Sequence, residues 1–176
     1  MRIKNLSLPD GQYHDQLKRA NGKTIDFGWR SNVVVDQCRQ LLAAFMLGET
    51  VNGIQLIELG RGESEWDILP NVASDPSIDN LADLTPFSIP VVDDAMQVDF
   101  IDNTGNVISG PSQRIQVRVT LVPGSLPIAS DETFPLREFA LFGQLGSENF
   151  MIDYVRHPVM HIGSEDSLTR TIRLVF

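Results

Sequence analysis

The chain has 176 residues, of which 42% are apolar and 21% are charged, values that are ordinary for a globular protein. This length suits one domain, with or without an arm, and excludes two full-sized domains. The 14 Lys and Arg residues against 23 Asp and Glu residues give a formal net charge of −9. Nucleic acid is therefore not expected as a partner, because the basic footprint that grips phosphates is missing.

The cysteine count and the first residues bear on cellular location. The single cysteine, Cys38, cannot form an intramolecular disulfide, and residues 1–10 lack the apolar stretch of a signal peptide. The longest apolar run, residues 41–47, is far shorter than the roughly 20 residues that cross a bilayer. We expect synthesis in a reducing cytoplasm and no membrane span.

In chain order, residues 1–28 are expected to form an N-terminal arm that contacts a partner. The first clear element is a helix over residues 33–47, where Ser31 or Asn32 would cap the start and Gly48 would end the last turn. One side of this helix is apolar and the other is polar, so it should pack on a flat surface. The apolar side consists of Val34, Cys38, Leu41, Leu42 and Phe45.

Strand patterns follow the helix. Residues 54–59 predict a strand that ends at Gly60-Arg61-Gly62, and residues 115–122 alternate between apolar and polar side chains. The other expected strands are the hairpin of residues 98–101 and 106–109, and the segments 139–142, 150–155 and 171–176. About six strands with short turns and one helix predict a mainly β (α+β) fold, in which an antiparallel sheet or sandwich over residues 29–176 carries the amphipathic helix.

An acidic stretch interrupts this pattern. Residues 62–113 contain ten Asp and Glu residues and no Lys or Arg, and prolines at positions 70, 76, 86 and 90 break any regular period. We expect a long acidic surface loop at about residues 62–97. Loops of this length are usually either mobile or held by a partner. The simpler interpretation is a solvated loop, and the alternative is a strap that docks on a basic neighbour.

No catalytic, cofactor-binding or metal-binding residue is assigned from the sequence. Cys38 lies on the apolar side of the expected helix, where a cysteine behaves as a small apolar residue. His157 and His161 would lie roughly 13 Å apart on a strand, too far to bind one ion unless a turn at Pro158 or symmetry brings histidines together. His14 stands alone in the sequence.

Two glycine-containing segments are weak candidates for ligand sites. Residues 99–106 lack the residue order of a calcium loop and suit a plain turn equally well. Gly60-Arg61-Gly62 has neither the lysine nor the following helix that phosphate binding requires. An enzyme is therefore not expected.

A resemblance appears in the last third of the chain. The segments 137–143 (REFALFG), 150–159 (FMIDYVRHPV) and 168–176 (LTRTIRLVF) resemble, in this order, the closing strands of tail-fibre and baseplate-associated proteins of bacteriophages and contractile injection systems. The earlier helix, the strand at residues 54–59 and Trp66-Asp67 are similar to the opening of such domains. The similar motifs extend from about residue 29 to residue 176, and their order carries more weight than any one of them.

The resemblance implies a non-enzymatic structural subunit, assembled into a virion tail or an injection-machine baseplate. No collagen-like repeat follows the last strand, so an adaptor that links baseplate to fibre is favoured over a fibre tip. The expected partners are other copies of the chain, most simply as a trimer, and other tail, baseplate or fibre proteins. The candidate contact residues are Tyr13, Phe27, Trp29 and Trp66, because large aromatic side chains anchor interfaces.

Two other functions remain open from the residues. One is a carbohydrate- or receptor-binding β-module of a tail fibre, which would need aromatic side chains on its surface. The other is a metal-dependent hydrolase on a β-sandwich, with His157 and His161 as the candidate metal ligands.

Overall fold

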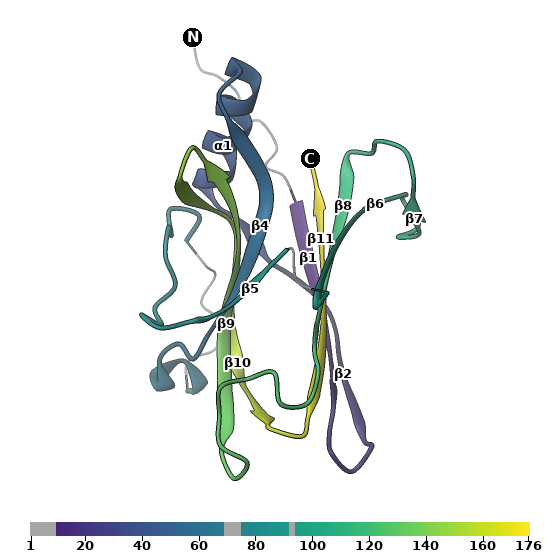
Figure 1. Cartoon of the computed structure of the whole chain (residues 1–176), viewed down its shortest axis with the longest axis vertical. Coiled ribbons are helices and arrows are strands. Elements are labelled where there is room, and N and C mark those ends of the chain that lie inside the picture. The colour runs from purple at the N-terminus through teal and green to yellow at the C-terminus, as the bar shows by residue number, and fades with distance from the viewer. Residues whose placement is uncertain (1–9, 69–74, 92–93) are drawn as a thin grey trace.

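The computed structural model describes residues 10–68, 75–91 and 94–176. These residues form two antiparallel β-sheets that face each other, with one α-helix at one end of the molecule (Figure 1). The expected mainly β fold with a single helix is therefore confirmed. None of the helices among these residues is long and apolar enough to cross a membrane.

The first sheet, sheet A, has six strands in the order β2-β1-β11-β8-β6-β7. Its central strands show the alternation that the sequence predicts: along β8, Val117, Val119 and Leu121 are buried between the sheets, whereas Arg118 is exposed. The strands are β1 (Asp10–Lys18), β2 (Thr24–Ser31), β6 (Met96–Ile101), β7 (Val107–Ile108), β8 (Arg114–Leu121) and β11 (Ser167–Val175).

The second sheet, sheet B, has five strands in the order β3-β10-β9-β4-β5. The long strands β9 and β10 form a hairpin around Gly146, whose positive φ of 60° suits a tight turn. The strands are β3 (Val33–Val34), β4 (Val51–Gly60), β5 (Phe87–Pro90), β9 (Thr133–Leu145) and β10 (Glu148–Gly163). The expected strands in the second half of the chain are thus present, and several are longer than the sequence pattern indicates.

The main core fills the space between the sheets. It combines fully buried side chains of sheet A, such as Leu17 and Ile172, with Phe139 and Leu141 of sheet B. A smaller apolar cluster lies on the other face of sheet B. That cluster contains Val35, Leu81, Ala140, Phe142, Met151 and Tyr154. Sheet B is therefore covered on both faces, by sheet A across the main core and by the residues of the smaller cluster on the other side.

The helix α1 spans Asp36–Leu47, and it starts three residues later than the sequence predicts. Val33 and Val34 pair with β10, and Val35 remains extended, so the chain cannot turn into a helix before Asp36. The expected caps, Ser31 and Asn32, are wrong: the helix starts without a side-chain cap, and the Asp36 amide donates to the Pro76 carbonyl. The C-terminal prediction is confirmed, because Gly48 adopts φ 87° and its amide bonds back to Phe45.

The acidic stretch is more regular than the sequence suggests. It contains a short 3-10 helix, η1 (Ser64–Asp67), the strand β5, and the start of β6 at Met96. Leu81 and Ile78 belong to the cluster on the outer face of sheet B, so residues 75–86 lie against that face. Part of the expected loop, residues 69–74 and 92–93, lies outside the described residues.

The expected N-terminal arm needs correction from residue 10 onwards. β1 lies between β2 and β11, and all nine of its residues pair with β11. Tyr13 and Leu17 of β1 are buried in the core. Residues 10–28 are therefore an integral part of sheet A, while residues 1–9 lie outside the described part of the chain.

Candidate functional site

Charged side chains lie between the two sheets, where apolar residues are the rule. The guanidinium of Arg170, which is 1% exposed, donates two hydrogen bonds of 2.7 Å to the carboxylate of Asp15. It also lies 3.7 Å from the centre of the Phe139 ring, and its Nη2 is 3.1 Å from Nε2 of His157. This bidentate ion pair gives both oxygens of Asp15 and two of the three guanidinium nitrogens of Arg170 a hydrogen-bond partner inside the protein.

A second carboxyl group completes this inner polar cluster. The side-chain carboxamide Nδ2 of Asn32 donates to Oδ2 of Asp153, a fully buried residue of β10. The Asn32 side chain passes next to Gly11 to reach Asp153. A Cβ atom on residue 11 would collide with the Asn32 side chain, so glycine leaves room for this contact. Among the described residues, three buried atoms of this cluster lack a hydrogen-bond partner: Oδ1 of Asn32, Oδ1 of Asp153 and Nη1 of Arg170.

The inner cluster changes the protonation of two of its members. Burial raises the pKa of Asp153 to about 8, against the lowering effect of Arg170. Burial and the positive charge of Arg170 lower the pKa of His157 to about 4. At neutral pH, Asp153 is thus mainly protonated and His157 is neutral, so Asp15 and Arg170 form the charged pair.

The outer face of sheet B buries another carboxylate. Glu138 of β9 is completely buried, and it accepts hydrogen bonds from the amides of Ala82 and Asp83 and from the Tyr154 hydroxyl. Its neighbour Arg137 donates two hydrogen bonds to Asp67, at 3.0 and 2.8 Å. The Arg-Glu pair that opens the REFALFG motif therefore holds both parts of the acidic stretch against sheet B.

Apolar side chains are exposed on the last turn and a half of α1. Phe45, Met46 and Leu47 are 65%, 82% and 80% exposed, and Leu42 is partly exposed beside them. Only Cys38 and Leu41 of this helix are buried. A second exposed apolar group lies on β6 and β7, in the same half of the molecule (Figure 1). It consists of Val98, Phe100, Val107 and Ile108.

The four predicted contact residues occupy different environments. Tyr13 is buried, edge-on to Phe139, and Phe27 is partly buried against the core. Trp66 is half-buried in η1, with the Arg156 guanidinium 4.1 Å from its ring. Trp29 is 44% exposed on the outer face of sheet A. The structure does not bring the four together, and a role in partner contacts stays a prediction for each of them.

The histidines and the cysteine singled out in the sequence are also separated. The imidazole of His157 is buried between the sheets, whereas Nδ1 of His161 is paired with the Thr133 hydroxyl. Within the described ranges, no group of three or more His, Cys, Asp and Glu side chains is arranged to hold a metal ion. Cys38 is also buried. Its burial, and to a smaller extent the charge of Asp153, raise the pKa of its thiol to about 11.

The turn between β6 and β7 is held by its own first residue. The Gly105 amide donates to the Asp102 carbonyl, and Oδ1 of Asp102 accepts from Thr104 and Asn106. These bonds lower the pKa of the Asp102 carboxyl below its usual range. The turn that the sequence predicts at these residues is confirmed.

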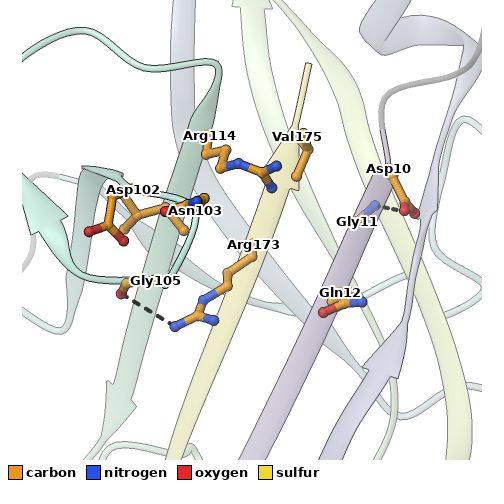
Figure 2. Close-up of a pocket in the computed structure, with 10 residues that line it drawn as sticks. Asp10, Gly11, Gln12, Asp102, Asn103, Gly105, Arg114, Arg173 and Val175 are labelled. Carbon is orange, nitrogen blue, oxygen red and sulfur yellow. Dashed lines mark hydrogen bonds between the residues drawn. The ribbon is translucent and has the colours of Figure 1, made fainter.

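A polar pocket of about 200 Å³ opens beside this turn (Figure 2). Figure 2 shows Asp102 and Asn103 on one side, Asp10 and Gln12 of β1 on the other, and two arginines between them. Arg114 comes from β8 and Arg173 from β11, so the pocket joins four segments that are distant in the sequence. Strand patterns give no signal for this convergence, because it depends on the order of the strands in the sheet.

The inner cluster, in contrast, has a signal in the sequence. Asp15 lies between Tyr13 and Leu17 on the inward side of β1, and Arg170 lies between Leu168 and Ile172 on the inward side of β11. An acid and a base at inward positions of two strands are candidates for a buried pair. The sequence pattern does not predict that β1 and β11 are neighbours in the sheet, with Asp15 directly opposite Arg170.

Comparisons with known proteins add no assignment to these sites. No protein-family model matches the chain, and no significant match was found among curated proteins or solved structures.

Proposed function

We propose that the chain is a non-enzymatic structural subunit of a phage-type tail or contractile injection machine, an adaptor that self-associates and links baseplate to fibre. The observation that carries this proposal is the exposed apolar end of α1. Large apolar side chains that are 65–82% exposed next to one another are typical of surfaces that another protein covers. The resemblance of the last three strands to tail and baseplate proteins supplies the class of assembly.

The position of the exposed apolar groups supports self-association. One group lies on α1, which packs on sheet B, and the other lies on the β6–β7 edge of sheet A. If the α1 group of one copy contacts the β6–β7 group of the next, the contact joins two different surfaces. Head-to-tail contacts of this kind generate rings when the rotation between copies closes. A trimeric ring is the arrangement that the resemblance favours.

The proposal is tested by measuring mass in solution over a range of concentrations, by sedimentation velocity or light scattering. The wild-type chain should form a homo-oligomer at micromolar concentration. The double variant Phe45→Gln, Met46→Gln keeps good helix formers but removes the apolar surface, and it should be monomeric. The control is Leu84→Gln, which removes an apolar side chain that is 94% exposed elsewhere, and should assemble normally.

A wild-type chain that stays monomeric at high concentration would count against self-association through α1. The assignment to a tail is tested separately, by gold-labelled antibodies against the chain on tail particles from the organism or phage that encodes it. Label at the baseplate or the fibre attachment is expected. Particles that carry no label would overturn the assignment.

A further inference from the structure

The outer face of sheet A carries the pocket of Figure 2. We propose that this pocket binds one ring of a neutral sugar, and that the Trp29 ring beside it supports the next ring of a longer glycan. The pocket contains no residue of α1 and none of the four exposed apolar residues of β6 and β7, so the proposal does not rest on assembly.

The pocket offers hydrogen-bond donors that the protein itself leaves free. Nε of Arg173 donates to Gln116 at 3.0 Å, and its Nη2 donates weakly to the Gly105 carbonyl at 3.4 Å. Within the described ranges, neither Arg173 nor Arg114 forms an ion pair, and no side-chain hydrogen bond holds the Arg114 guanidinium. The Arg114 guanidinium and the remaining N–H groups of Arg173 are therefore available to a ligand.

Acceptors line the same pocket. Oδ1 of Asp10 accepts one hydrogen bond, from the Gly11 amide at 2.9 Å, and the carboxylate has further acceptor positions. The carboxamides of Gln12 and Asn103 both donate and accept, and they face the pocket from opposite sides (Figure 2). Asp102 is mostly occupied by its own turn.

The charge of the lining selects the class of ligand. Two arginines and two aspartates cancel, so the pocket has no net charge to attract an anion or a cation. A sugar hydroxyl both donates and accepts a hydrogen bond, and this lining supplies partners of both kinds. The volume of about 200 Å³ is below the roughly 300–1,000 Å³ of pockets for drug-sized ligands, which suits a single ring.

An aromatic surface lies next to the pocket. Trp29 is opposite His14 on the neighbouring strand, with the two rings stacked 5.2 Å apart, and the Arg173 guanidinium lies 4.4 Å from the Trp29 ring. These contacts hold the indole in place while 44% of the residue stays exposed. A fixed, exposed indole can stack on the apolar face of a second sugar ring.

Backbone geometry keeps the turn close to Arg173. Gly105 adopts φ 92°, and a Cβ atom at this position would collide with the Arg173 guanidinium. Glycine therefore allows the turn to approach the arginine and to form one wall of the pocket.

The first experiment is an amide-resonance NMR titration of the full chain with glucose, galactose, mannose, rhamnose and N-acetylglucosamine, with glucuronate as the anionic probe and glycerol as the control for nonspecific polyol contact. At least one neutral sugar should give saturable shifts of Gln12, Asn103 and Arg114. Arg173→Ala and Arg114→Ala should each weaken binding about tenfold or more, because each removes a charged hydrogen-bond donor.

The matched control is Arg118→Ala, which removes an exposed arginine of β8 that does not line the pocket. This variant should bind the sugar as the wild type does. Arg173→Lys serves as a second variant in case the alanine variant does not fold, since it keeps the charge but loses the planar fork, and it should also bind more weakly.

The second experiment tests the Trp29 platform. A disaccharide of the sugar that binds should bind more tightly than the single ring, and Trp29→Ala should remove this gain without changing the affinity for the single ring. The proposal is overturned if no neutral sugar saturates, if glucuronate or glycerol alone shifts the same resonances, or if the arginine variants bind as the wild type does. The oligomeric state of each sample, measured by sedimentation, keeps this outcome separate from the outcome for assembly.

Discussion

Sheet B buries a carboxyl group on each of its faces, and the two groups are stabilised differently. On the outer face, Glu138 accepts hydrogen bonds from two backbone amides and a tyrosine hydroxyl. On the inner face, Asp153 accepts a hydrogen bond from the side-chain carboxamide of Asn32, and its Oδ1 lacks a partner among the described residues.

The difference follows from what covers each face. A loop such as residues 75–86 brings backbone amides that are free to bond, whereas the strands of sheet A have their amides committed to each other. A carboxylate under a loop can therefore be fully satisfied, and a carboxyl under a sheet depends on side chains. Both inner carboxyl groups avoid an unpaired buried charge in this way or by protonation. Asp15 is paired with the Arg170 guanidinium, and Asp153 keeps its proton.

The largest effect is expected when one member of the inner ion pair is removed. Asp15→Ala leaves the Arg170 guanidinium buried without its counter-charge, which should destabilise the fold by about 3–5 kcal/mol. The free energy of unfolding in urea measures this loss. The control is Asp26→Ala, which removes the exposed partner of His14 on the same sheet and should cost much less.

A near-neutral effect of Asp15→Ala would mean that Arg170 finds water or another acceptor, and the inner cluster would then be less closed than its burial indicates. The double variant Asp15→Leu, Arg170→Met separates the two cases. Because it removes both charges, it should recover much of the lost stability.

A smaller loss is expected on the outer face. Glu138→Ala leaves the amides of Ala82 and Asp83 and the Tyr154 hydroxyl without their acceptor, at a cost of about 3 kcal/mol. Part of this loss can be avoided, because residues 75–86 can detach from sheet B, and the freed amides can then form hydrogen bonds with water. Hydrogen exchange at the amides of Ala82 and Asp83 should therefore become faster, while the exchange of β11 stays slow.

Glu148→Ala, at an exposed position of β10, is the control for the outer face and should change neither quantity appreciably. If the amides of Ala82 and Asp83 stay protected in Glu138→Ala, the loop is held by its apolar contacts through Leu81, and the comparison between the two faces is weakened.

Much of this architecture can be predicted where a local pattern decides the structure. The alternation along residues 115–121 predicts β8, and Gly48 predicts the end of α1, since both depend on residues that are close in the sequence. β1 escapes prediction because Asp15 breaks its inward apolar pattern, which becomes consistent only when Arg170, 155 residues later, is placed opposite. Glu138 carries a signal as an acid within an apolar strand, but its partners lie in a loop.

The smallest effect, and the most specific to the inner face, is a pH dependence. The pKa of Asp153 is raised from 3.8 to about 8, so the folded state keeps a proton that the unfolded state loses as pH rises. The pKa of His157 is lowered from 6.5 to about 4, so below pH 6.5 the unfolded state binds a proton that the folded state does not. Between about pH 4 and 6.5 the two states hold equal numbers of these protons, and the two contributions to the pH dependence cancel.

Of these two protons, only that of Asp153 differs between the folded and unfolded states above pH 6.5, and its contribution should lower stability by about 1.4 kcal/mol per pH unit up to about pH 8, roughly 2 kcal/mol in all. Asp153→Asn should abolish this slope, because the amide is neutral at every pH, while Asp131→Asn at an exposed position should keep it. Urea unfolding of the three proteins at about pH 5.5, 6.5 and 8 measures the slope. A wild-type slope equal to that of Asp153→Asn would show that Asp153 is ionised in the fold, and that the inner face stabilises its carboxylate as fully as the outer face does.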